Sequence, residues 1–186
     1  NSPGTYTLTY SLVDSNGKKS DSIEREVYIP DPERAPRVLG VNAFDGAVEV
    51  RAVETDAFGN QYSTGVFQGL ATFGDFSLRA TGSDAFVSCR DANGFIRWAK
   101  RLGGLDVVET TDLAVSPDGG VYLAGNFQGV CEIDDLALAA SGLSDGFLLK
   151  LDNSGSVSWA KPVGGSGVDS SESVAVAPDG SVRWVG

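Results

Sequence analysis

Two short acidic motifs are the first residues in this chain whose type and spacing could do chemistry. Asp91 and Asp152 each lie three residues before a glycine. A carboxylate in this position can begin a calcium loop, but an EF-hand loop also needs oxygen ligands at alternate positions and a distal glutamate. The residues that follow these glycines do not supply that pattern. We therefore interpret both motifs, together with the Asp-Gly pairs at 118–119 and 179–180, as hairpin turns, with cation sites as the alternative.

Catalytic chemistry finds little support in the composition. The chain has no histidine, which removes the commonest general base, the Ser-His-Asp triad and every histidine-ligated metal site. Asp134 and Asp135 are adjacent, but among 25 acidic residues a chance pair is the default interpretation and a glycosidase pair the alternative. We predict that the protein is not an enzyme. We assign no catalytic, cofactor-binding or metal-binding residue, and no cofactor.

Trp98 and Trp159 lie 61 residues apart, at the same place in two similar segments. A large ring at a repeated position most often packs between neighbouring structural units, because it buries much apolar area. The spacing Asp-x-x-Gly-x-x-x-Trp loosely resembles the tryptophan-docking element of quinoprotein propellers, although it is one residue shorter before the glycine. We predict core packing for both rings, with a sugar-stacking platform as the alternative.

The chain has two cysteines, Cys89 and Cys131. They align with Lys150 and Ala71 in the similar segments, so neither lies at a position that the repeat requires. We predict that both are unpaired. A disulfide between neighbouring units is the alternative, and it would need an oxidising compartment.

A repeat of about sixty residues connects these motifs. Residues 62–69 return as 122–129, and residues 91–100 return as 152–161. Such a period, with turn residues at fixed places, indicates stacked supersecondary units. One unit contains four short apolar stretches separated by turn signals, at 113–115, 121–124, 147–151 and 157–159. Four strands per unit are typical of a propeller blade.

The repeat makes specific equivalences testable. We expect Phe86 to be equivalent to Phe147, Trp98 to Trp159 and Val115 to Val176, with each of the six side chains largely buried. The fold class predicted from this pattern is all-β, with propeller blades of about sixty residues.

The start of the chain has a different organisation. Residues 1–29 alternate large apolar and small polar side chains, which predicts a β-hairpin, and Asn16-Gly17 suits its turn. Residues 30–36 contain three prolines and are interpreted as a stiff linker. Residues 37–186 are then predicted to form an incomplete propeller of about two and a half repeats. We expect the chain to be part of a longer polypeptide or to be completed by partners, with β-strands from outside covering both ends.

Two family resemblances are carried by these residues. Pro-Gly-Thr-Tyr-Thr-Leu-Thr-Tyr at 3–10 resembles the last strands of bacterial immunoglobulin-like surface domains, over residues 1–30 or so. Ser-Asp-Ala-Phe-Val at 83–87 and the segment 142–180 resemble the bacterial SBBP-type β-propeller repeat, over roughly residues 48–186. Arg183-Trp184 departs from the Tyr-Val usual in that repeat. The resemblance implies secreted or cell-surface proteins and no common catalytic activity.

Charge and hydropathy limit the partners. The formal net charge of −11 argues against nucleic acid, because phosphate binding needs clustered Lys and Arg. No apolar run approaches the eighteen residues or so of a membrane span. We predict a non-enzymatic extracellular or cell-surface scaffold or adhesion protein. The alternatives are a subunit of an extracellular fibre or surface assembly, and a carbohydrate-binding or hydrolytic propeller. The expected partners are other protein subunits or flanking domains, with surface glycans as a second class.

Overall fold

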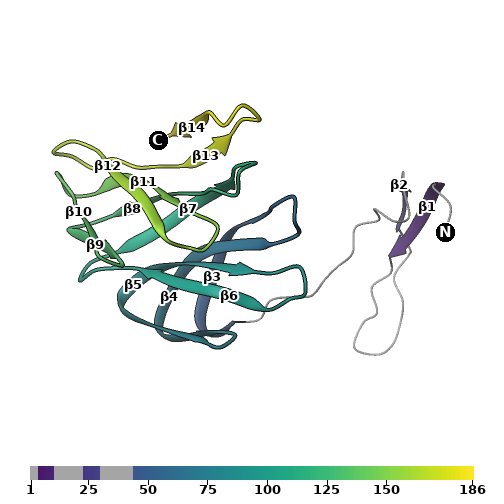
Figure 1. The fold of residues 1–186 in the computed structure, drawn as a ribbon, viewed down its shortest axis with the longest axis horizontal. Coiled ribbons are helices and arrows are strands. Elements are labelled where there is room, and N and C mark those ends of the chain that lie inside the picture. The colour runs from purple at the N-terminus through teal and green to yellow at the C-terminus, as the bar shows by residue number, and fades with distance from the viewer. Residues whose placement is uncertain (1–3, 11–22, 30–43) are drawn as a thin grey trace. The chain divides into compact units, whose positions relative to one another are not determined.

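The computed structural model describes residues 4–10, 23–29 and 44–186, and all of their regular elements are β-strands. The predicted all-β class is therefore confirmed. The chain divides into two compact parts, Asn1–Val41 and Asn42–Gly186. In the first part, β1 (Gly4–Tyr10) pairs antiparallel with β2 (Ile23–Ile29) (Figure 1). The turn expected around Asn16 and the linker expected at 30–36 lie outside the described residues.

The second part contains two four-stranded antiparallel sheets and a final hairpin. The first sheet has the order β3 (Asp45–Thr55), β4 (Gln61–Phe73), β5 (Phe76–Arg90) and β6 (Ile96–Leu102). The second sheet has the order β7 (Val108–Val115), β8 (Val121–Phe127), β11 (Asp145–Leu151) and β12 (Val157–Val163). A small hairpin of β9 (Val130–Ile133) and β10 (Leu136–Ala139) separates β8 from β11. The final hairpin pairs β13 (Ser173–Val176) with β14 (Val182–Val185), and none of these sheets closes on itself.

The strand registers follow the sequence repeat. Equivalent residues face equivalent partners: Phe86 lies opposite Gly65 and Phe147 opposite Gly125, Trp98 opposite Cys89 and Trp159 opposite Lys150, Val115 opposite Val121 and Val176 opposite Val182. The predicted equivalences therefore hold at the level of strand pairing.

The predicted burial holds for only part of this set. Phe86, Phe147 and Trp98 are buried, with 0%, 1% and 8% of their surface exposed. Trp159, Val115 and Val176 are only partly buried, which corrects the expectation for them. For Trp159 the reason is its neighbourhood. In the part of the chain that the structure describes, no four-stranded sheet follows the second sheet, so β12 has no outer strands of a next repeat against it.

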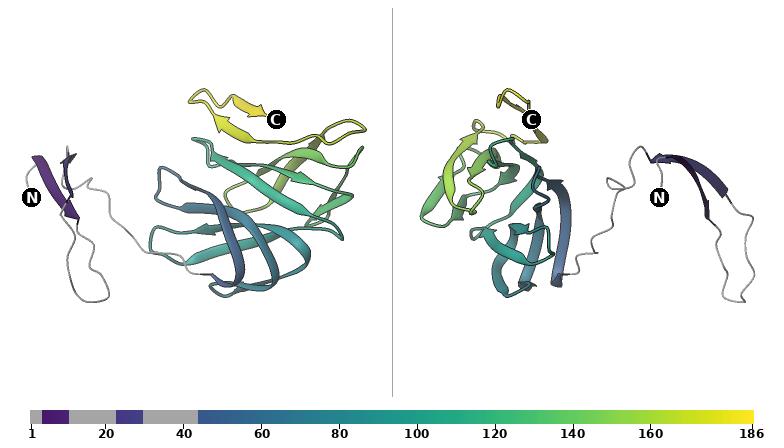
Figure 2. Two further views of the ribbon diagram at one scale, coloured as in Figure 1. Left: turned by 180° about the vertical axis from the view of Figure 1, so that it is seen from behind. Right: turned by 45° about the vertical axis from the view of Figure 1, so that its right-hand side comes forward.

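The second sheet lies between the first sheet and the β13–β14 hairpin (Figures 1 and 2). β7, the first strand of the second sheet, contacts β3 on one side and β13 on the other. We call these three first strands the inner strands. Because successive side chains of a strand point to opposite faces, β8 contributes to two cores. Leu123 belongs to the core shared with the first sheet, and Tyr122 belongs to the core shared with β13–β14.

Both cysteines are free and buried, each with 1% of its surface exposed. Burial raises the pKa of Cys89 to about 11 and that of Cys131 to about 12. A thiol with such a pKa stays protonated near neutral pH, where only the thiolate is a good nucleophile. The two side chains therefore act as small apolar residues of the core between the sheets.

Candidate functional site

The tryptophan of the first sheet docks on the acidic turn of the second sheet. Trp98 Nε1 donates a hydrogen bond to the Asn153 carbonyl oxygen at 3.2 Å. Gly155, which follows in the same turn, has φ +84°, and a Cβ there would lie 2.7 Å from the Trp98 ring. The ring also packs on Tyr62, with 6.1 Å between centroids. Sequence analysis singled out the turn and the tryptophan, but it did not show that they meet across two repeats.

The acidic residues of these motifs hold hairpin turns. Asp152 Oδ1 accepts hydrogen bonds from the Ser154 amide at 2.9 Å, the Ser154 hydroxyl at 2.6 Å and the Ser156 amide at 2.9 Å. Asp91 Oδ1 accepts two amide hydrogen bonds in the same pattern, at 2.9 and 3.0 Å. Among the described residues, no three His, Cys, Asp or Glu side chains lie close enough together to hold a metal ion.

We expect the turn carboxylates to make the fold sensitive to acid. Hydrogen bonding from Ser154 lowers the pKa of Asp152 below its ordinary value of 3.8, and hydrogen bonds from Ser116 and Ser181 lower the pKa values of Asp118 and Asp179. Because these values are lower in the folded state, the stability that the ionised groups contribute is present above about pH 4 and is lost as the pH falls through the folded-state values. The temperature at the midpoint of thermal unfolding, measured from pH 7 to pH 3, should therefore decrease once the pH is below about 4.

A substitution tests this assignment. Asp152→Asn removes the charge but keeps an oxygen acceptor, so it should lower the midpoint temperature of thermal unfolding at pH 7. It should also reduce the difference between the midpoint temperatures at pH 7 and at pH 3. Asp135→Asn changes an exposed carboxylate outside these turns and serves as the matched control. If Asp135→Asn reduced this difference as much as Asp152→Asn does, the role of the turn would be contradicted.

Polar pairs join the first sheet to β7 of the second sheet and, at the outer edge, to the β9–β10 hairpin. Three contacts lie at the inner, middle and outer positions: Arg51 Nη1 to Glu109 Oε2 at 2.7 Å, Thr64 Oγ1 to Thr110 Oγ1 at 2.8 Å, and Lys100 Nζ to Asp134 Oδ2 at 2.6 Å. We call this whole interface, with Trp98 and its turn, the first joint. Asp134, which the sequence presented as half of an acidic pair, is thus an ion-pair partner. It also lies in the β9–β10 turn with φ 49°.

A second joint connects the second sheet to the β13–β14 hairpin. Asp112 Oδ2 accepts hydrogen bonds from the Ser173 hydroxyl at 2.6 Å and the Val174 amide at 2.9 Å. Asn126 Oδ1 accepts one from the Ser171 amide at 2.6 Å. Asp112 lies on β7 and Asn126 on β8, so these hydrogen bonds join the first two strands of the second sheet to β13 and to the residues that lead into it.

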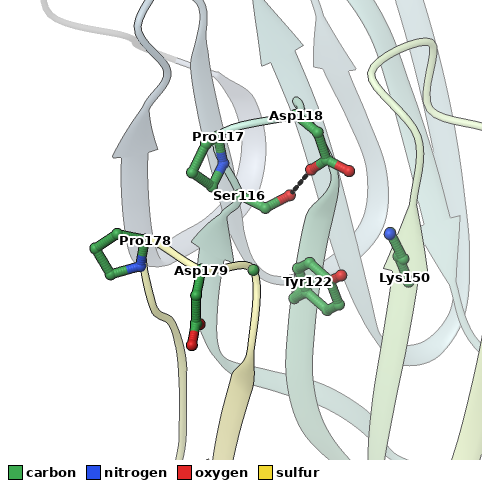
Figure 3. Close-up of a pocket in the computed structure, with 8 residues that line it drawn as sticks. Ser116, Pro117, Asp118, Tyr122, Lys150, Pro178 and Asp179 are labelled. Carbon is green, nitrogen blue, oxygen red and sulfur yellow. Dashed lines mark hydrogen bonds between the residues drawn. The ribbon is translucent and has the colours of Figure 1, made fainter.

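A pocket of about 360 Å³ lies at the second joint, between the turn that precedes β8 and the turn that precedes β14 (Figure 3). It is lined by Ser116, Pro117, Asp118, Tyr122, Lys150, Pro178, Asp179 and Gly180. Lys150 lies opposite Tyr122 on the neighbouring strand, with its Nζ 5.1 Å from the ring centroid. A hydrogen bond with Tyr122 raises the pKa of Lys150. The pocket thus offers an ammonium group, an aromatic face and two carboxylates to a polar ligand.

The sequence repeat contains a signal for this pocket. Lys150 takes the place of Cys89 of the first repeat, so a charged residue replaces a buried thiol at an equivalent position. At the first joint, the corresponding pocket lies beside Tyr62 and Asp56 and has only about 110 Å³. Cys89 does not line this smaller pocket, whose lining includes Arg97 instead, so the ammonium group of Lys150 belongs to the larger pocket alone.

Two buried aspartates were also missed. Asp84 and Asp145, with 0% and 1% of their surface exposed, begin equivalent stretches of the third strand in each sheet. Asp84 Oδ2 accepts hydrogen bonds from Arg101 Nε at 2.5 Å and the Thr81 amide at 3.0 Å, and Asp145 Oδ2 accepts one from the Ser141 amide at 2.8 Å. The recurring Ser-Asp-x-Phe at 83–86 and 144–147 was the available signal.

No protein-family model matches this chain, and no curated protein matches it significantly. Among the residues that the structure describes, no helix is long and apolar enough to cross a membrane.

Proposed function

We propose that this protein is a non-enzymatic scaffold or adhesion protein, secreted or at the cell surface, built from β-propeller blades similar to the SBBP-type repeat. The observation that supports it best is the first joint, in which repeated residues pack one four-stranded sheet on the next. Neighbouring inner strands β3, β7 and β13 are the arrangement expected when blades surround a common axis. Stability in such an array depends on contacts between neighbouring repeats.

For residues 1–30 or so, we propose the end of an immunoglobulin-like surface domain. The antiparallel pairing of β1 with β2 supports this assignment. A chain with one module of each kind suits a surface protein whose partners are flanking domains or other subunits.

Electron microscopy of the native assembly tests the proposal against its alternative. We expect discrete particles that contain a ring of blades. Regular filaments would instead favour a subunit of an extracellular fibre or surface assembly, and particles without radial repeats would contradict the propeller.

The pocket in Figure 3 supports a second candidate, a carbohydrate-binding propeller. Ligand pockets combine apolar or aromatic walls with a few polar groups that set orientation, and Tyr122 and Lys150 meet this description. A glycan array tests it: binding that Lys150→Ala abolishes would support this function. Arg79→Ala, at an exposed position on another strand, should leave binding unchanged. An array without any binding would remove this candidate.

A further inference from the structure

The second sheet carries residues equivalent to those that the first sheet uses in the first joint, but among the described residues no further four-stranded sheet packs on them. Tyr122 and Trp159 pack together with 6.1 Å between ring centroids, as Tyr62 and Trp98 do in the first sheet. Trp159 is only partly buried, however. Lys161 Nζ lies 6.0 Å from the centroid of the Trp159 ring. Lys161 is exposed, and it forms no ion pair with any described residue.

The first joint shows what covers the residues equivalent to Trp159 and Lys161 when a full sheet follows. Trp98 is covered by the turn that contains Asn153 and Gly155, and Lys100 binds the β9–β10 turn through Asp134. Both turns belong to the outer half of the second repeat, residues 130–163. This outer half pairs with the rest of its sheet through β11 on the edge of β8.

The β13–β14 hairpin presents the edge that such an outer half would use. β14 follows β13 as β8 follows β7, and among the described strands β14 pairs with β13 alone. An unpaired strand edge carries free amide and carbonyl groups that favour the addition of a further strand. Trp184 on β14 and Trp159 pack against the same small core. The unpaired edge of β14 and the exposed part of Trp159 thus form a surface that extends the second joint.

We propose that this surface binds the outer half of a further repeat. One of its strands would pair with β14, its Asp-x-x-Gly turn would cover Trp159, and an acidic turn would bind Lys161. The inference rests on the stacking of repeats proposed above, and it adds the chemistry of the occupant. A glycine in the turn is required because any Cβ would meet the tryptophan ring, as at Gly155.

A second copy of this chain fits the surface less well. Its own outer half is already paired with β8 and covers its own Trp98, so lending that segment would break its first joint. The occupant is therefore an additional outer half, and exchange between two copies is an outcome that the experiment must detect.

A peptide of residues 130–163, labelled with a fluorophore and kept under reducing conditions, tests the proposal when it is added to the 186-residue chain. We expect saturable binding by fluorescence anisotropy. Trp159→Ala and Lys161→Glu in the chain should each weaken it about tenfold or more, as removal of a central contact usually does. Gly155→Ala in the peptide should weaken it to a similar extent.

Phe95→Ala in the chain is the matched control, because Phe95 is an aromatic residue with 72% of its surface exposed on another turn. It should leave binding unchanged, and circular dichroism should show that every variant is folded. No binding at about 1 mM peptide, or binding that ignores Trp159 and Lys161, would contradict the proposal. Dimers that form without peptide and depend on Trp159 would assign the surface to a second copy instead. Because electron microscopy tests the stacking of blades separately, the failure of either idea can be recognised without the other.

Discussion

Replacing Trp98 with alanine is expected to destabilise the second part of the protein by about 3–5 kcal/mol, the usual cost of truncating a buried tryptophan. The ring has 8% of its surface exposed, contacts Gly155 and packs on Tyr62. Its removal would leave a cavity in the first joint and the Asn153 carbonyl without its donor. Urea unfolding followed by circular dichroism measures the effect as a change in the free energy of unfolding.

Trp159→Ala is the matched comparison, since both residues occupy the same place in the repeat. Trp159 is only partly buried, so its truncation should cost clearly less than that of Trp98. Trp98→Phe keeps most of the ring and removes the hydrogen bond, which contributes about 1 kcal/mol. If Trp98→Ala and Trp159→Ala cost the same, the first joint would not be the source of the stability.

Gly125→Ala is expected to destabilise the second sheet by about 1–3 kcal/mol or more, the range for overpacking a filled interior. A Cβ on Gly125 would lie 2.2 Å from the Glu109 carbonyl oxygen and 2.6 Å from the Phe147 ring. The first of these atoms belongs to the backbone of β7, which pairs with β8 at this point. Relief of the clash would therefore require the two strands to separate. Thermal unfolding of the variant measures the loss.

Gly167→Ala provides the control for this substitution. Gly167 is exposed, and a Cβ there would have no neighbour within 4 Å, so the variant should unfold as the parent does. Gly65→Ala should repeat the effect in the first sheet, where the added Cβ would lie 1.9 Å from the Glu49 carbonyl oxygen. A neutral outcome at both Gly65 and Gly125 would show that the inner strands are not held as closely as this geometry requires.

Together these variants separate two sources of stability. Gly65 and Gly125 act within a sheet, because they let the inner strand approach its neighbour. Trp98 acts between sheets, because Asn153 and Gly155, which it meets, belong to the next repeat. Loss of stability from Trp98→Ala would support an array in which each repeat depends on the following one.

The strands, turns and repeat could be predicted from the sequence because their causes are local. Alternation with a period of two marks strands, and glycine marks the turns where φ is positive, as at Gly94 and Gly155. Equivalent residues recur 60 or 61 positions apart, so equivalent strand pairings could be predicted as well.

Only the tertiary structure decided which repeated residues meet. Trp98 and Asn153 are 55 residues apart and lie in different repeats, and no local preference of either residue encodes their contact. Likewise, Lys150 meets Asp179 in one pocket because the β13–β14 hairpin packs on the second sheet. The clearest case is the comparison of Trp98 with Trp159. Their local sequences are similar, but the first ring is buried and the second is partly exposed, because burial depends on the sheet that packs against the ring.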